Sequence, residues 1–105
     1  MTTQTIVRRD TSVDFSALTI SGDVVYYEDQ NALVIVDNET GLPERLSVNL
    51  GAYNLTPRPG HVFIKDWSEG AGVASSLEDS GMVEIVAAYS VGPHAARAFE
   101  VRVNA

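Results

Sequence analysis

Two histidines, and the acidic residues that follow one of them, are the side chains best suited to holding a metal ion. His61 and His94 would supply nitrogen ligands. Asp66 or Glu69 would add carboxylate oxygens. None of these residues has the HxH, HxxxH or HExxH spacing of recurrent metal sites, and His94 lies far along the chain. We therefore expect no metal centre and no cofactor.

No other arrangement in the sequence is typical of catalysis. The chain has no cysteine, which excludes disulfides and thiolate chemistry. Ser68 lacks the G-x-S-x-G context of a nucleophile and has no base near it in the sequence. The adjacent carboxylates at 28–29 and 78–79 are of a kind that is usually solvated. These patterns predict a protein that is not an enzyme.

The segment 61–70 combines an apolar run with charged residues and the only tryptophan of the chain. One interpretation makes Trp67 and Glu69 part of a partner-binding edge, with Trp67 as its anchor. The other places Trp67 between a helix and the sheet, while Ser68 and Glu69 cap the helix. A single tryptophan in a small domain usually contributes core area, so the second interpretation is favoured.

Tyr26 and Tyr27 are adjacent, so on a strand one points into the core and the other outward. The outward tyrosine would stand between Asp23 on one side and Glu28 with Asp29 on the other. An exposed tyrosine on an acidic surface suits an arginine-rich partner through ion pairing and cation–π contact. The alternative, slightly favoured, is a surface aromatic that shields its sheet edge.

The first half of the chain has a one-sided charge distribution. Between residues 10 and 44 it has no lysine or arginine but contains eight carboxylates: Asp10, Asp14, Asp23, Glu28, Asp29, Asp37, Glu39 and Glu44. Such a segment repels nucleic acids and anionic membranes and attracts basic surfaces. We therefore predict a basic protein partner, with Asp37 and Glu39 among its contacts.

The composition is that of one globular domain. The chain has 105 residues, 45% of them hydrophobic, and a formal net charge of -7. The polar N-terminus does not resemble a signal peptide, and no stretch approaches the roughly 18 apolar residues of a membrane span. We expect a soluble cytoplasmic protein, either monomer or homodimer, that contacts neither membrane nor nucleic acid directly.

Local patterns predict mostly strands. Residues 1–12 are expected to form a flexible leader with at most a short edge strand at 5–7, and residues 13–105 a single domain. Short apolar or alternating runs predict strands at 24–27, 33–36, 45–50, 62–64, 82–89 and 98–103. One helix is predicted at 71–80, with Ser68 as N-cap and Gly81 as the left-handed residue that ends it.

These elements predict an α+β fold, in which a curved, mainly antiparallel and barrel-like sheet of five or six strands packs on one short helix. The predicted core contains Phe63, Ile64, Trp67, Val73, Leu77, Val83, Ile85, Val101 and Val103.

One stretch resembles a family of small uncharacterised proteins of bacteria, phages and mobile elements. In that family an apolar strand leads into Phe-Ile-Lys-Asp-Tyr-Ser-Glu, a short helix, a glycine and another strand. Here Phe63–Glu69 reads FIKDWSE, and the resemblance covers roughly residues 45–84. Trp67 replaces the usual tyrosine, and residues 70–72 replace a more polar helix start. The resemblance implies an accessory protein of mobile elements and carries no activity.

Three functions are consistent with these observations. The leading hypothesis is a non-enzymatic protein of a phage or mobile element that docks an acidic face on a basic host protein, such as a nucleic-acid-handling defence enzyme. The second is an assembly module that pairs through an exposed sheet edge. The third is a protein that binds a small molecule or a metal.

Overall fold

The described part of the chain has an α+β fold, with seven strands in two antiparallel sheets and one α-helix. The computed structural model describes residues 4–67 and 70–105. The first sheet has the order β1-β2-β3-β4, with β1 (Gln4–Asp14), β2 (Thr19–Tyr27), β3 (Ala32–Asp37) and β4 (Pro43–Arg45). The second has the order β5-β7-β6, with β5 (His61–Lys65), β6 (Val83–Val91) and β7 (Ala96–Val103). The helix α1 spans Val73–Asp79, and the short 3-10 turns η1 and η2 span Glu28–Gln30 and Gly51–Tyr53.

The predicted α+β class is confirmed, but the single barrel-like sheet of five or six strands is not. Among the described residues the strands form sheets of four and three, and neither sheet closes on itself. One isolated bridge, between Val48 and Phe63, joins the chain leaving the four-stranded sheet to the edge of the three-stranded one. The two sheets are therefore layers rather than parts of one continuous barrel.

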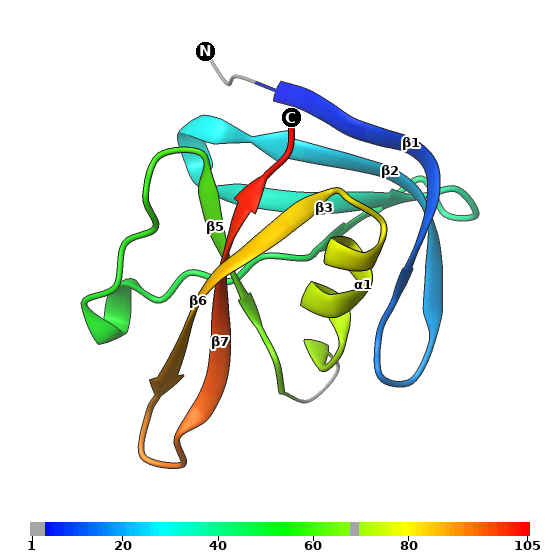
Figure 1. Cartoon of the computed structure of the whole chain (residues 1–105). Helices are drawn as coiled ribbons and strands as arrows, with labels where there is room; N and C mark the ends of the chain where they lie inside the picture. The colour runs from blue at the N-terminus through cyan, green and yellow to red at the C-terminus, as the bar shows by residue number, and fades with distance from the viewer. Residues whose placement is uncertain (1–3, 68–69) are drawn as a thin grey trace.

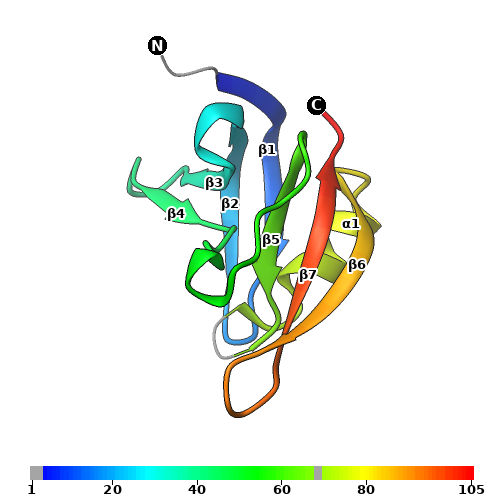
Figure 2. The same cartoon turned by 90° about the vertical axis from the view of Figure 1, so that its left-hand side faces the viewer.

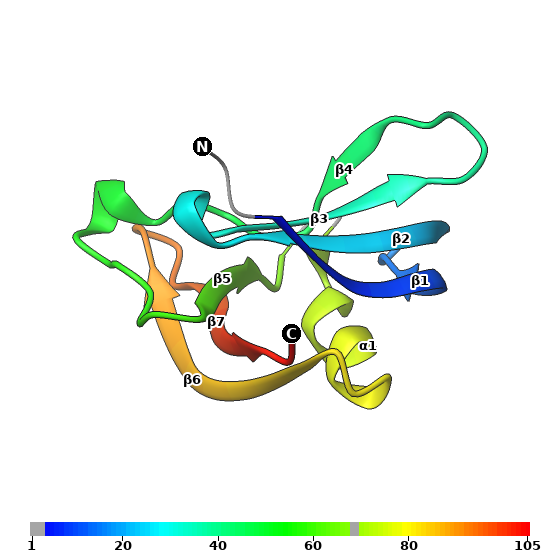
Figure 3. The ribbon, with the colours of Figure 1, turned by 90° about the horizontal axis from the view of Figure 1, so that it is seen from above.

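The core lies between the two sheets and beside α1. Figures 2 and 3 show α1 and the three-stranded sheet on the same side of the four-stranded sheet. Buried side chains from both sheets and the helix meet there, among them Val24, Leu33, Ile35, Ile64 and Leu77. No helix of the described chain is long and apolar enough to cross a membrane.

Most of the predicted core is confirmed. Seven of its nine residues are buried: Phe63, Ile64, Val73, Leu77, Val83, Val101 and Val103. Ile85 and Trp67 are only partly buried, Ile85 against the main core and Trp67 against a second apolar cluster around Phe63. That cluster lies on the far face of the three-stranded sheet, so both faces of this sheet are covered.

The N-terminal segment is not a leader in its described part. Residues 4–12 belong to β1, which pairs with β2 from Gln4 to Asp14. The pairing shifts register between Ile6 and Thr11, and Asp10 takes a left-handed φ of 48°. These irregularities bend β1 and β2 together, so that the β1–β2 turn descends beside α1 (Figure 1).

The bent end of β1 is attached to the helix by two hydrogen bonds. The Asp14 N–H donates to Ser76 Oγ at 3.1 Å, and the Arg8 guanidinium donates to the Ser80 carbonyl. Gly81 has a φ of 78° and its N–H donates to the Glu78 carbonyl, as predicted for the residue that ends the helix.

Two predicted element boundaries are wrong. The strand expected at 45–50 is replaced by β4, which ends at Arg45, because the N–H groups of Leu46 and Ser47 both turn to the Leu33 carbonyl. The helix begins only at Val73, with Gly72 at its N-cap position. The predicted cap residue Ser68 lies outside the described residues.

Candidate functional site

The eight carboxylates of residues 10–44 all belong to the four-stranded sheet and its turns, but they occupy two separate ends. Glu28 and Asp29 lie in η1, before β3 begins, whereas Asp37 ends β3 and Glu39 follows in the next turn. The six residues of β3, at about 3.3 Å each, separate the two groups by roughly 20 Å. Charges that far apart are screened from each other at physiological salt. The predicted acidic face is therefore not one continuous surface.

Six of the eight carboxylates gather at one end. We call this the distal end of the sheet and define it as residues 10–23 and 36–44. Its carboxylates are Asp10, Asp14, Asp23, Asp37, Glu39 and Glu44. This part of the sequence contains no lysine or arginine.

Hydrogen bonds hold part of the distal end in place. Asp23 accepts a bond from the Asp10 N–H at 2.9 Å and pairs with Arg9 at 3.6 Å. The Asn38 side chain donates to Asp10 at 3.3 Å. Because Arg9 is mostly exposed, its ion pair with Asp23 offsets little of the negative field.

An apolar pocket opens at the distal end, between the β1–β2 turn and β4. It has a volume of about 180 Å³ and is lined by Phe15, Ala17, Leu18, Ile20 and Glu44. Leu18 is 55% exposed, and Leu42, in the β3–β4 turn, is 61% exposed. At this end the β1–β2 turn descends beside α1 (Figure 1), whereas the β3–β4 hairpin extends away from the body (Figure 3).

The structure decides which of the two tyrosines points outward. Tyr26 pairs with Leu33 and is 5% exposed within the main core, so it is not available to a partner. Tyr27 lies on the opposite face of the sheet and is partly buried. The predicted contact at Tyr26 is therefore wrong, since the register of β2 on β3 turns Tyr26 inward.

The Tyr26 hydroxyl is buried without a hydrogen-bond partner among the described residues. Burial raises the pKa of Tyr26, and the negative charge of Glu28 raises it further. An unpaired buried hydroxyl costs about 1–3 kcal/mol of desolvation. Removing the Tyr26 hydroxyl should therefore not lower the stability of the protein.

We predict that Tyr26→Phe leaves the free energy of unfolding unchanged or raises it by up to about 2 kcal/mol. Urea denaturation followed by circular dichroism measures the change. Tyr89→Phe is the matched control, because the Tyr89 hydroxyl donates to Glu100 at 3.1 Å and its loss should destabilise by about 1 kcal/mol. A clear loss of stability in Tyr26→Phe would contradict the prediction.

Trp67 lies at the rim of the second apolar cluster rather than in the core. It is partly buried against that cluster, and the Lys65 Nζ lies 5.9 Å from its ring centroid. Trp67 therefore does not pack between α1 and the sheet, as the favoured interpretation predicted, and its role as a partner-binding anchor stays a prediction. The neighbouring predicted contact, Glu69, lies outside the described residues.

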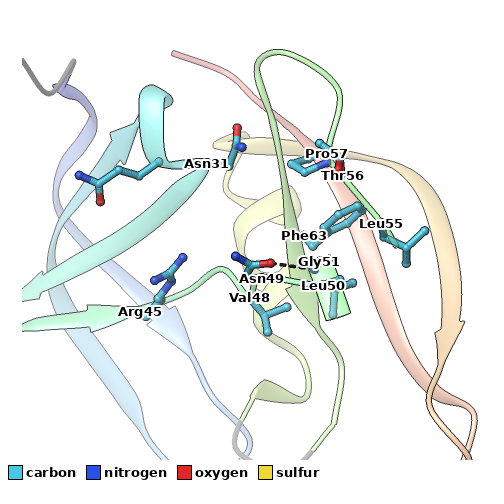
Figure 4. A pocket seen from close by; sticks show the side chains of 11 residues that line it. Asn31, Arg45, Val48, Asn49, Leu50, Gly51, Leu55, Thr56, Pro57 and Phe63 are labelled. Carbon is cyan, nitrogen blue, oxygen red and sulfur yellow. Dashed lines mark hydrogen bonds between the residues drawn. The ribbon is translucent and has the colours of Figure 1, made fainter. Parts of the chain in front are cut away.

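A different pocket, of about 170 Å³, lies where η1, the end of β4 and the chain that follows β4 meet (Figure 4). Gln30, Asn31, Arg45 and Asn49 give it polar walls. Its apolar lining comes from Val48, Leu50, Leu55, Pro57 and Phe63. Sequence reasoning missed this site, because its residues come from three segments that show no common motif.

A buried carboxylate holds the loop that forms one wall of this pocket. Glu100 in β7 is 2% exposed. It accepts hydrogen bonds from the Arg58 N–H at 3.0 Å, from Arg58 Nε at 3.2 Å and from the Tyr89 hydroxyl at 3.1 Å. Burial alone would raise the pKa of Glu100, but these hydrogen bonds outweigh it, so the pKa lies below its ordinary value.

The residues considered for a metal site do not converge. His61 begins β5, opposite Arg102, whereas His94 lies in the turn between β6 and β7, at the other end of the same sheet. Asp66 accepts a hydrogen bond from the Gly72 N–H at 3.1 Å. Within residues 4–67 and 70–105, no three histidine or acidic side chains form a group that could hold an ion.

Comparison with known proteins gives no further guide to function. No protein-family model, no curated protein and no solved structure matches this chain.

Proposed function

We propose that the protein is a non-enzymatic binding protein that docks the distal end of its four-stranded sheet on a basic protein. The observation that supports the proposal is that six carboxylates belong to the distal end and that one of them, Glu44, lines the apolar pocket there. Leu18 and Leu42 would supply apolar contact, and Glu44 lines the same pocket as Leu18. A partner segment with one apolar side chain between basic residues fits this pattern of charge and shape.

The resemblance to proteins of phages and mobile elements narrows the class of partner. An accessory protein of such an element gains from blocking a host enzyme that handles nucleic acids, and these enzymes present cationic grooves. We propose a defence enzyme of this kind as the partner, with the distal end occupying the groove in place of nucleic acid.

A pull-down from lysate of the host cell tests the proposal with four baits. They are the wild-type protein, the distal variant Glu39→Lys/Glu44→Lys, the matched variant Glu28→Lys/Asp29→Lys at the other end of the sheet, and Leu18→Ser. We expect one basic protein to be retained by the wild type at low salt and released at high salt. The Glu28→Lys/Asp29→Lys bait should retain it, whereas the distal and Leu18→Ser baits should lose it.

Two outcomes would overturn this proposal. Equal loss from both charge-reversed baits would show that net charge, and not the distal end, attracts the partner. If the wild-type bait retains no protein at low salt, the proposed basic partner does not exist.

The second candidate function is assembly through the edge of β6. In the described chain the other edges are blunted: β1 by two register shifts, β4 by its length of three residues and Pro43, and β5 by the Val48 bridge. The edge of β6 is protected at one point, where the side chain of Glu78 in α1 accepts a hydrogen bond from the Ile85 N–H at 2.8 Å. Beyond that point the strand continues to Val91, and Val86 is 39% exposed. Sedimentation of the same four baits distinguishes this function, because self-pairing at β6 gives dimers in all of them.

A further inference from the structure

We propose that the pocket beside Arg45 binds a small carboxylate that carries an apolar group. The proposal does not depend on the distal end, since none of the residues that line the apolar pocket there lines this one. It rests on the hydrogen-bonding groups of one wall, the apolar lining opposite them and the size of the space.

Arg45 supplies the charge. It is exposed at the end of β4, and no ion pair or hydrogen bond engages its side chain among the described residues. Arg9, Arg58 and Arg102, by contrast, each pair with a carboxylate. An arginine in a pocket presents a planar fork of donors that matches the two oxygens of a carboxylate.

Asn49 adds a donor whose orientation is fixed. Its Oδ1 accepts the Gly51 N–H at 2.7 Å, so the amide oxygen is engaged and the Nδ2 group is left to donate. Figure 4 shows this nitrogen on the side of Arg45. Asn31, held in a left-handed conformation with φ 49°, lies above them in the same view. The polar wall therefore presents donors to an incoming anion.

Within residues 4–67 and 70–105, no carboxylate lines this pocket. Glu44 precedes Arg45 but pairs opposite the buried Ile35, and it lines two other pockets, one of which Arg45 also borders. Glu28 and Asp29 precede Gln30 without contributing to the lining. Among the residues that the structure describes, Arg45 is therefore the only charged side chain that lines the pocket, and its charge is positive.

The opposite wall and the volume define the rest of the ligand. Val48, Leu55 and Pro57 are partly buried, so they retain surface that a ligand can cover, above the buried ring of Phe63. The pocket, of about 170 Å³, has room for a monocarboxylate with a single ring or a short branched chain.

Amide NMR titration of the full chain with phenylacetate tests the proposal. We expect shifts concentrated at residues 45, 49, 51 and 55, with a dissociation constant of about 1 mM, as is usual for so small a ligand. Phenylacetamide, the neutral isostere, should bind at least about tenfold more weakly because it lacks the charge that Arg45 recognises.

Two variants and one control locate the site. Arg45→Gln should weaken phenylacetate binding about tenfold or more. Asn49→Asp retains the acceptor for the Gly51 N–H but replaces the Nδ2 donor by a negative oxygen, so it should abolish binding while leaving the spectrum of the free protein folded. Arg97→Gln, a change of the same charge at an exposed site on β7, should leave binding unchanged.

Several results would overturn the proposal: no shifts with phenylacetate up to about 50 mM, equal binding of phenylacetamide, or equal loss in Arg45→Gln and Arg97→Gln. Acetate serves as a further arm. If acetate binds as tightly as phenylacetate, the apolar wall contributes nothing and the proposed ligand class is wrong.

Discussion

Replacing Gly22 by alanine is expected to cost at least about 3 kcal/mol, a large part of the 5–15 kcal/mol that stabilises a typical domain. A Cβ at this position would lie 1.8 Å from the Val36 carbonyl oxygen and 2.7 Å from its carbon. Both atoms belong to the backbone of the neighbouring strand, so no side-chain rotation relieves the overlap. A glycine within a strand commonly marks such a close approach of another backbone.

The close approach at Gly22 is a consequence of the bend in the sheet. Gly22 pairs with Thr11 and Asp37, beside the register shift in β1. The bend brings the β1–β2 turn, whose residues line the apolar pocket of the distal end, beside α1 (Figure 1). Gly22→Ala should therefore also disturb the distal end, even in molecules that remain folded.

Thermal and urea denaturation measure the effect, with Gly41→Ala as the matched control. Gly41 also lies in the four-stranded sheet region, but a Cβ there meets nothing within 4 Å, and only its φ of 73° opposes alanine. That variant should lose about 1–2 kcal/mol. If Gly22→Ala is no less stable than Gly41→Ala, the strand approach at Gly22 is looser than described.

The strands and the helix could be predicted because local chemistry determines them. The runs at 24–27, 33–36 and 62–64 are rich in β-branched and aromatic residues and end at turn formers, and all three lie within strands. The sequence predicts at most a short edge strand at 5–7, whereas β1 spans Gln4–Asp14, because residues 8–12 are all polar and show no alternation. Pairing with β2 overrides that weak local preference.

The candidate sites could not be predicted to the same degree, because they depend on pairing and on which faces are covered. The register of β2 on β3 selects Tyr26 for the core, and the length of β3 divides the acidic residues into two ends. Glu100 occupies an alternating strand, where a polar residue is expected to face water. It is buried because the segment that follows β4 covers the second face of its sheet.

Replacing that buried carboxylate is the second change with a large expected effect. Glu100→Gln should lower the free energy of unfolding by about 2–4 kcal/mol at neutral pH, because Arg58 and Tyr89 direct donors at a group that must accept. Glu84→Gln is the matched control on the neighbouring strand. Glu84 pairs with Arg102 at 2.8 Å, but both side chains are 55% exposed, so its loss should cost less than about 1 kcal/mol.

The pH dependence of stability distinguishes the loss of the Glu100 charge from a loss of packing. The pKa of Glu100 is lowered in the folded protein, so the unfolded chain binds a proton more readily. The stabilisation from its charge is complete above the ordinary value of 4.5 and is lost as the pH falls through the lower, folded value. The difference in stability between wild type and Glu100→Gln should therefore shrink steadily in acid below pH 4.5. A difference that stays constant across that range would show that shape, and not charge, makes Glu100 important, and the Arg58 loop would then be held by packing alone.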